Sequence, residues 1–324
     1  MVTDNKIVSQ GVTYRTADEN DDGQRLDNFL ARILKGVPRS MVYRILRRGE
    51  VRVNKGRVSP SYKLKEGDVI RIPPVRVSEG PVTIPSSNLH LVQDLNERIL
   101  FEDENIIVVD KPAGLAAHGG SGIEYGLIEA LRALKPELPY LELAHRLDRE
   151  TSGCLIVAKR RSALRNLHEQ FRQRVVKKRY LTLVPGKWDR KVKLVEAPLK
   201  RNELRSGERM VEVNFRDGQP SSTGFDIVEE LSDATLVAAM PHTGRTHQIR
   251  VHCAYLRHPV GNDDKYGDKE FNAYLHSIGL KRMFLHAFRI TFLNPKDGRI
   301  MKIEAKLPKE LEAAVDVLRK HDGL

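Results

Sequence analysis

Residues 144–159 read AHRLDRETSGCLIVAK, a carboxylate between two arginines followed by an apolar run. LIVAK (155–159) has the length and composition of a buried strand, and the preceding Thr151-Ser152-Gly153 turns the chain into it. In an extended chain Arg146 and Asp148 lie on the same side, because the side-chain period is two. Asp148 is therefore either a surface ion-pair partner or a reactive acid that cations keep ionised. This stretch alone favours neither interpretation.

The chain around this stretch predicts more strands than helices. Apolar and β-branched runs predict strands at 106–110, 155–159, 179–184, 211–215, 223–230 and 235–240. Helical spacing predicts helices at 126–134, 162–173, 246–256 (with Thr246 as the N-cap) and 309–319. Because the two kinds of element are not regularly interleaved, we predict an α+β fold with a mixed, mainly antiparallel central sheet, flanking helices and loops.

Common catalytic signatures are missing from the sequence. There is no G-x-S-x-G nucleophile turn, and LHEQ (167–170) lacks the second histidine of a zinc-binding helix. The glycines at 119–122 are not followed by Lys and Ser or Thr, so a phosphate-binding loop is not indicated. We therefore predict no metal and no cofactor. Cys154 and Cys253 lie in apolar or amphipathic stretches and are expected to be buried free thiols.

Positive charge is concentrated near the N-terminus. The chain of 324 residues carries a net charge of +12, and residues 21–76 hold 14 Lys or Arg against 6 Asp or Glu. This segment has apolar residues at helical spacing over 26–34, closed near Gly36, and a second helix from Pro38 to a C-cap at Gly49. A short strand, a turn at 54–56 and GDVIRIPP complete a small α-plus-β unit.

The basic side chains of this segment have two interpretations. They could form a solvated face, or a surface that binds phosphates of a polyanion without reading its sequence. The second interpretation predicts six RNA-binding residues: Arg39, Arg44, Arg47, Arg48, Arg52 and Lys55. The order RLDNFL, SMVYRILRRGEVRVNKGRV and GDVIRIP resembles a small RNA-binding domain first known from a ribosomal small-subunit protein, the alpha-L motif. This resemblance implies binding of structured RNA.

Four further stretches resemble the large-subunit and tRNA-type pseudouridine synthases. HRLDRETSG follows a KPAG turn by about 35 residues and resembles the family's catalytic loop. The other three are FRQRVVKKRYLTLVPG, PHTGRTHQIRVH and HPVGNDDKYG, which agree in order and spacing. The resemblance covers essentially the whole chain. It implies isomerisation of uridine to pseudouridine in RNA, a reaction that breaks the N1–C1′ bond and rejoins the sugar at C5.

The resemblance also implies roles for individual residues. Asp148 would start cleavage of the glycosidic bond, Tyr180 would stack on the flipped base, and Arg250 would pair with Asp148 as its cation. Tyr180 could also help to remove the proton from C5 of uracil. Four neighbours of the substrate are implied beside them, and three of these are Arg146 against RNA, Ile249 against the base, and Arg149 in the same loop. His145 belongs to this group as a structural hydrogen-bonding residue rather than a general base.

These interpretations combine into one predicted organisation. We expect a polar tail (1–20), an RNA-binding domain (21–76), a linker (77–97) and a catalytic domain (98–324). No run of about 18 apolar residues occurs, so no membrane span is expected, and the N-terminus lacks the apolar core of a signal peptide. The expected protein is a cytoplasmic monomer. Its implied partner is 23S ribosomal RNA or its precursor particle, at several uridines near the peptidyl-transferase region.

Three alternatives remain open from the sequence. The chain could be a non-catalytic rRNA-binding or assembly factor, for which the basic segment alone would suffice. It could be a related synthase that acts on other rRNA or tRNA uridines. A carboxylate-pair glycosidase would need a second acid near Asp148, and Glu150 or Asp110 could supply it.

Overall fold

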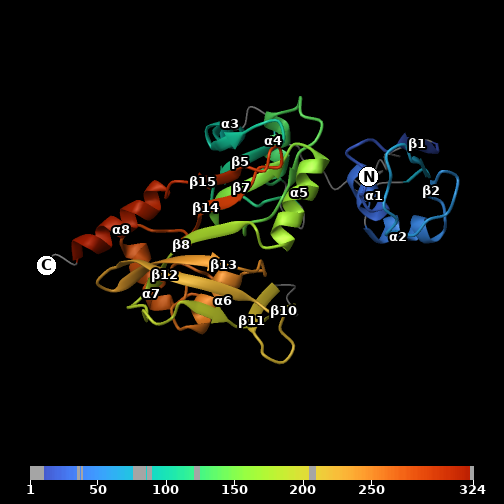
Figure 1. Cartoon of the computed structure of the whole chain (residues 1–324). Coiled ribbons are helices and arrows are strands. Elements are labelled where there is room, and N and C mark those ends of the chain that lie inside the picture. Colours follow the sequence, from blue (N-terminus) through green and yellow to red (C-terminus); the bar gives the residue numbers. More distant parts are fainter. Residues whose placement is uncertain are drawn as a thin grey trace, which may run out of the picture. The chain divides into compact units, whose positions relative to one another are not determined.

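The chain forms two compact units, each with its own hydrophobic core. One is built on the residues up to Pro85 and the other on most of the chain from Ser86 onward, and Figure 1 labels their elements. The computed structural model describes residues 11–34, 37, 39–75, 85, 90–119, 125–203 and 209–321. Within these ranges, none of the helices is both long enough and apolar enough to cross a membrane.

The N-terminal unit combines two helices with a three-stranded antiparallel sheet in the order β1-β3-β2. Its elements are β1 (Thr13–Thr16), α1 (Leu26–Ile33), α2 (Arg39–Arg47), β2 (Arg52–Val53) and β3 (Val69–Ile72). Both helices bury the apolar stripe that their spacing predicts. The buried side chains are Leu26, Phe29 and Leu30 on α1 and Val42, Ile45 and Leu46 on α2.

Local turn chemistry fixes the ends of these elements. Gly49 has φ +69° and ends α2, with its N–H donating to Leu46 and the N–H of Glu50 donating to Ile45, both at 3.0 Å. This pair of bonds is a Schellman motif, so the predicted C-cap is confirmed. Asn54 and Lys55 both have positive φ, 49° and 68°, and form the predicted turn after β2. Gly36 and Pro38 lie outside the described residues.

The predicted polar tail and linker are both too long. Thr13–Thr16 forms strand β1, which pairs with β3, and Ala17 is buried, so residues 11–20 do not all belong to a tail. All four residues of β1 are exposed, and backbone hydrogen bonds to β3 hold the strand. Because none of its side chains is buried, the sequence shows no apolar pattern there. In the predicted linker, residues 90–97 form helix α3 (His90–Glu97), which buries Val92 and Leu95 in the core of the C-terminal unit.

The C-terminal unit is built on one large sheet in the order β4-β5-β7-β14-β8-β13-β12-β9. Strand β15 pairs with β14 and β6 with β7, and every pairing is antiparallel except the one between β7 and β14. The predicted mixed, mainly antiparallel sheet is confirmed. Its strands are β4 (Ile99–Glu102), β5 (Ile106–Lys111), β6 (Glu142–Leu143), β7 (Ser152–Ala158), β8 (Lys177–Pro185), β9 (Leu194–Glu196), β12 (Ser222–Glu230), β13 (Ala234–Pro241), β14 (Leu285–Leu293) and β15 (Ile300–Glu304).

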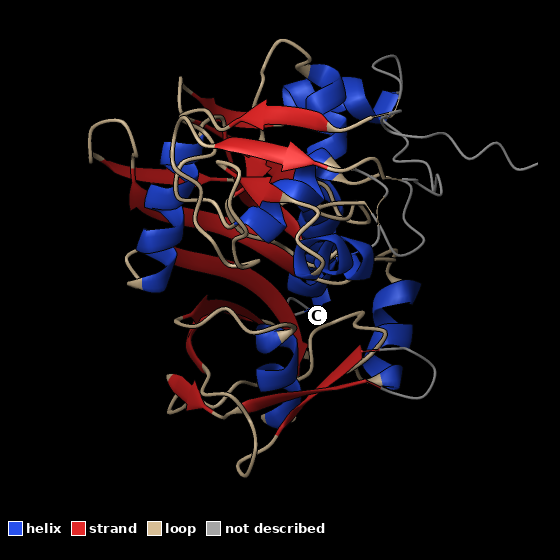
Figure 2. Ribbon diagram, turned by 90° about the vertical axis from the view of Figure 1, so that its right-hand side faces the viewer, coloured by secondary structure: helices blue, strands red, loops and turns tan. Residues whose placement is uncertain are grey.

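Helices flank this sheet, and a separate hairpin of β10 (Leu199–Glu203) and β11 (Arg209–Val213) adjoins helix α6 (Figures 1 and 2). The remaining helices are α4 (Leu127–Leu134), α5 (Arg161–Arg172), α6 (Gln248–Tyr255), α7 (Lys269–Ser277) and α8 (Lys309–His321). Both cysteines are buried and free, as predicted. The predicted cap of α6 is wrong: the N-cap is His247, in the left-handed conformation, and not Thr246.

A close approach of two strands positions the loop that carries Asp148. Gly153 pairs with Ala287 where β7 runs parallel to β14, and its φ is +109°. A Cβ atom at this position would come within 2.4 Å of the carbonyl oxygen of Ala287, so only glycine allows the two backbones to meet. The loop 144–151 therefore enters the middle of the sheet beside β14 and β8.

Candidate active site

A cavity of about 650 Å³ opens beside the middle strands of the C-terminal unit. Its walls come from four segments: the loop 144–151 before β7, the end of α5 with β8, the residues from the end of β13 into α6, and Leu285 on β14. Six Lys or Arg side chains and one carboxylate line it, and the carboxylate is Asp148. The six cations are Arg146, Arg172, Arg174, Lys178, Arg245 and Arg250. Such a lining suits a polyanionic ligand.

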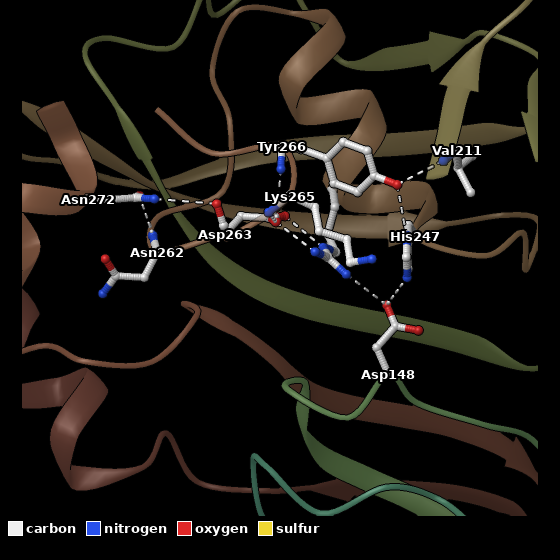
Figure 3. A network of polar contacts seen from close by, with 9 residues as sticks. Asp148, Val211, His247, Asn262, Asp263, Lys265, Tyr266 and Asn272 are labelled. Carbon is white, nitrogen blue, oxygen red and sulfur yellow. Dashed lines mark hydrogen bonds and ion pairs between the residues drawn. The ribbon is translucent and has the colours of Figure 1, made fainter. Parts of the chain in front are cut away.

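Asp148 pairs with residues about 100 positions away rather than with the arginines beside it. Its Oδ2 lies 3.7 Å from Nη1 of Arg250 and 3.9 Å from Nε2 of His247, as Figure 3 shows for the contacts of this carboxylate. The carboxyl side chain is one-quarter exposed toward the cavity. Arg250 is thus the cation that the resemblance implied for Asp148. The implied pairing is present in the structure, whereas a simple Asp-Arg surface pair is not.

Arg250 is itself held by a second carboxylate. Its Nε and Nη2 donate to the two oxygens of Asp263, both at 2.6 Å, and Asp263 is only 1% exposed. Burial raises the pKa of Asp263, but the hydrogen bonds and the charge of Arg250 outweigh it, so this pKa lies below its ordinary value. Burial lowers the pKa of Arg250, and Asp263 reverses that effect and raises it. A charged, fixed guanidinium therefore faces Asp148.

Asp263 was not among the site residues predicted from the sequence. It lies in HPVGNDDKYG, a stretch recognised there only as a family signature, beside a second aspartate from which no pattern distinguishes it. In the structure its Oδ1 also accepts the backbone N–H groups of Lys265 and Tyr266, at 2.9 and 3.1 Å. These bonds close the turn that carries Asp263 toward Arg250, so the backbone of the turn fixes the carboxylate.

Tyr180 and Ile249 line the cavity and are mostly buried. Tyr180, in the middle of β8, is 9% exposed, and both residues belong to the main core of the unit. Burial raises the pKa of Tyr180, and the nearby charge of Asp148 raises it further, so the phenol stays protonated. Tyr180 is therefore a core residue and at the same time part of the cavity wall.

His145 and Lys178 lie in the wall near Tyr180. Nε2 of His145 accepts the N–H of Ile156 at 3.1 Å, and burial lowers the pKa of His145 to about 3. This neutral, bonded ring agrees with the structural role expected for it. Burial lowers the pKa of Lys178 to about 8, because the cavity wall shields its ammonium from water. Arg146 is exposed and lines the cavity.

Arg149 does not line the cavity. Its side chain is 64% exposed, pairs with Glu150 and donates to the carbonyl of Gly114 at 3.2 Å. The backbone carbonyl of Arg149 accepts a bond of 3.0 Å from Nζ of Lys111, which is fully buried and also donates to Pro112 and Leu115. Burial lowers the pKa of Lys111 to about 7. Lys111, which the sequence analysis did not single out, ties the KPAG turn to the loop of Asp148.

Two further expectations concern acids and metals. Neither Asp110 nor Glu150 lines the cavity, so the carboxylate pair of a glycosidase does not form around it. In the part of the chain that the structure describes, no three His, Cys, Asp or Glu side chains gather closely enough to hold a metal ion.

The basic residues predicted to bind RNA are accessible in the N-terminal unit. Arg44, Arg47, Arg48 and Lys55 are exposed and Arg52 is partly exposed. The side chain of Arg39 lies outside the described residues. Arg44 and Arg47 lie on the side of α2 that faces away from its buried stripe, and Arg48 directly follows the helix. All three side chains are exposed, so an external anion can reach them.

Comparisons with known proteins agree on one family. Residues 105–255 match the family model described as RNA pseudouridylate synthase, and residues 24–70 match the model described as S4 domain. Three curated relatives are each called ribosomal large subunit pseudouridine synthase C and are each 55% identical to this chain. They come from Haemophilus influenzae (97% of this chain and 98% of the relative), Pasteurella multocida (98% and 97%) and Escherichia coli K12 (94% and 95%).

Solved structures give the same answer for the C-terminal unit. Human RNA pseudouridylate synthase domain containing 4 is 26% identical, with a TM-score of 0.59, over 71% of this chain and 95% of the human one. Human RNA pseudouridylate synthase domain containing 1 is 27% identical, with a TM-score of 0.55, over 74% and 90%. Asp148, Tyr180 and Arg250 lie inside the residues matched by the family model, whereas Asp263 and Tyr266 follow them.

Proposed function

Since the chain belongs to the RNA pseudouridylate synthase family, we propose that it converts uridines of ribosomal large-subunit RNA to pseudouridine. The observation that carries the proposal is the pair of Asp148 and Arg250, 3.7 Å apart in a cavity whose other charged side chains are cationic. The ribosomal substrate is supported by three relatives of this name that align with nearly the whole chain. We place the enzyme with its RNA in the cytoplasm, as a monomer.

Asp148 starts the reaction in this proposal. Its carboxylate initiates cleavage of the N1–C1′ bond, the uracil turns, and a C5–C1′ bond forms while the proton leaves C5 and N1 gains one. Arg250 favours the ionised form of the acid through its positive charge. Because Asp263 fixes the guanidinium from the other side, the charge is in place before RNA arrives.

The target base must leave its stack to reach Asp148. Extruding a base costs a few kcal/mol, which contacts to the RNA backbone offset. A cavity of about 650 Å³ lies within the range of small-ligand sites. Tyr180 stacks on the base and Ile249 packs against it, and the raised pKa of Tyr180 supports stacking over action as a phenolate base. Arg146, exposed beside the cavity, contacts the RNA from which the base was extruded.

The basic face of α2 should anchor the RNA. Replacing Arg44, Arg47 and Arg48 together by Ala is expected to lower the slope of log Kd against log salt by about 2 to 3. The reason is that each lost phosphate contact removes roughly 0.7 to 0.9 from that slope. Salt-dependent binding of rRNA fragments measures it. A control of equal charge is the triple change of Arg299, Lys302 and Lys309 to Ala. Equal slopes for the two triple variants would contradict the anchoring role.

The class of RNA is tested by tritium release. The purified full chain is incubated with 23S rRNA, 16S rRNA or tRNA labelled with tritium at C5 of uridine, and released tritium is counted. We expect release from 23S rRNA, abolished in Asp148→Ala, with sites mapped by comparing rRNA of a deletion strain with its parent. Release from tRNA or 16S rRNA instead would assign a different target. No release from any RNA, with binding intact, would favour a non-catalytic rRNA-binding factor.

A further inference from the structure

We propose that His247 is a positioning residue for Asp148, and that Tyr266 fixes the proton of its imidazole on the nitrogen that faces the carboxylate. The inference deepens the proposed function and rests on it. His247 and Arg250 would then be two donors that converge on one oxygen of the reacting acid, one neutral and one charged. The family motif PHTGRTHQIRVH suggested partners at Ile249 and Arg250 only, and no role had been predicted for His247.

The first observation is a continuous line of polar contacts that ends at Asp148 (Figure 3). The backbone N–H of Val211, on β11, donates to the hydroxyl oxygen of Tyr266 at 2.9 Å. That hydroxyl lies 2.9 Å from Nδ1 of His247, and Nε2 of the same ring lies 3.9 Å from Oδ2 of Asp148. The rings of His247 and Tyr266 meet edge to face, 5.6 Å apart at 69°.

The positions of the protons on Tyr266 and His247 determine the tautomer of the imidazole. The hydroxyl oxygen of Tyr266 accepts from Val211, and its own proton needs an acceptor. Nδ1 of His247, 2.9 Å away, is the acceptor that the structure places beside it. A neutral imidazole that accepts at Nδ1 carries its proton on Nε2. The N–H of Nε2 is thereby directed at Asp148. With the proton on Nδ1 instead, the Tyr266 hydroxyl would lose this acceptor, and the lone pair of Nε2 would face the carboxylate of Asp148.

Burial, assisted by two neighbouring cations, favours the neutral ring of His247. Burial lowers the pKa of His247, Asp148 opposes this, and Arg250 and Lys265 lower the pKa further, while Asp263 opposes them. Tyr266 contributes a hydroxyl donor and not a charge. His247 thus reaches Asp148 as an uncharged hydrogen-bond donor, which orients the carboxylate without neutralising it. The two atoms are 3.9 Å apart, beyond hydrogen-bond distance, and the proposal requires this distance to shorten in the complex with RNA, as catalytic contacts often do.

The backbone at His247 gives a second, independent observation. The residue has φ 51° and ψ 20°, the left-handed conformation that a side chain with Cβ rarely adopts. It occupies the N-cap of α6, yet its side chain makes no capping bond. Helix caps usually use a short polar side chain to bond the first N–H groups of the helix. Here the strained position directs the ring away from the helix end and toward Tyr266 and Asp148 instead.

The test uses three variants of the full chain: His247→Ala, His247→Gln and Tyr266→Phe. Gln can still present an amide N–H close to the position of Nε2, whereas Ala presents none. Matched controls are His276→Gln, an exposed histidine in the last turn of α7, and Tyr255→Phe, an exposed tyrosine on α6. Single-turnover tritium release and RNA affinity are measured from pH 5 to 9, and thermal melting reports whether each variant folds.

For His247→Ala we expect single-turnover release to slow by about 10- to 100-fold, the effect of losing a bond to a charged group. RNA affinity should stay within twofold, His247→Gln should recover much of the rate, and both controls should match the wild type. In Tyr266→Phe, Nδ1 loses its donor and becomes free to bind a proton, so the pKa of His247 rises. The imidazolium then competes for the charge of Asp148, and the acid limb of the rate profile moves to higher pH.

Three outcomes would overturn the proposal. They are a rate for His247→Ala within twofold of the wild type, equal rates for the Ala and Gln variants, or an unmoved acid limb in Tyr266→Phe. If His247→Ala does not fold, the rate of His247→Gln and the profile of Tyr266→Phe decide. A wild-type enzyme that releases no tritium from any RNA would instead refute the proposed function itself, and that result is distinct from a variant effect.

Discussion

Replacing Arg250 by Met is expected to damage both the stability and the activity of the enzyme. The change leaves Asp263, which is 1% exposed, without its cation, and breaking a buried ion pair in this way costs about 3–5 kcal/mol. For a unit of this size such a loss lowers the melting temperature by roughly 10 °C. The same change removes the cation beside Asp148, which should reduce the rate of tritium release by about 10²- to 10³-fold.

A second substitution separates the two effects. The double variant Arg250→Met, Asp263→Asn has no buried charge left at this position, so most of the lost stability should return. Activity should not return, because Asp148 still lacks its cation. Melting temperature and single-turnover release are measured on the single and double variants. Arg190→Met, which removes an exposed partner of Glu230, serves as control and should change stability by less than about 1 kcal/mol.

The double variant could also contradict the account. If its rate recovers together with its stability, Arg250 acts only by holding the turn around Asp263 in place, and the 3.7 Å contact with Asp148 has no part in the reaction. If Arg250→Met melts at the same temperature as the wild type, the bidentate pair of Arg250 and Asp263 does not stabilise the loop. That result would contradict the claim that Asp263 fixes the guanidinium before RNA binds.

Local patterns predicted many of the regular elements, because those elements carry their signal in consecutive residues. The apolar stripes of α1 and α2, the C-cap at Gly49 and the strands predicted at β5, β7, β8, β12 and β13 are all present. Strands β14 and β15 and helix α7 were not predicted, although β14 is a central strand of the sheet. Two other missed elements carry little signal in the sequence. Strand β1 is fully exposed, and α3 is a short helix in a polar stretch that presents only Val92 and Leu95 to the core.

The residues of the candidate site also differ in whether they could be predicted from the sequence. The pairing of Asp148 with Arg250 followed from a resemblance and is present at 3.7 Å. Asp263 and Tyr266 follow Arg250 in the chain, and one turn brings both of them to the site. The periodicity and spacing of the sequence therefore do not predict their contacts with Arg250 and His247. His247 was expected inside a helix, where its ring would point elsewhere, because a left-handed residue at the helix start has no marker in the sequence.

Arg146 is close to Asp148 in the sequence, whereas Arg250 is close to it only in the folded chain. Two arginines beside an acid are visible in any reading of residues 146–149, whereas a cation 102 positions later becomes a neighbour only once β7, β8 and α6 have assembled. In the structure Arg146 is exposed at the cavity and Arg149 turns to Glu150. The partners of Asp148 are instead Arg250 on α6 and His247 at the N-cap of that helix.

The most direct test of the account is the Asp148→Asn variant, which keeps the size of the side chain and removes only its charge. Single-turnover tritium release from 23S rRNA is measured alongside the dissociation constant for the same RNA. Losing the reacting group should lower the rate by about 10⁴-fold or more while RNA binding stays within a few-fold of the wild type. Release from Asp148→Asn at a rate near that of the wild type would contradict the claim that this carboxylate performs the chemistry.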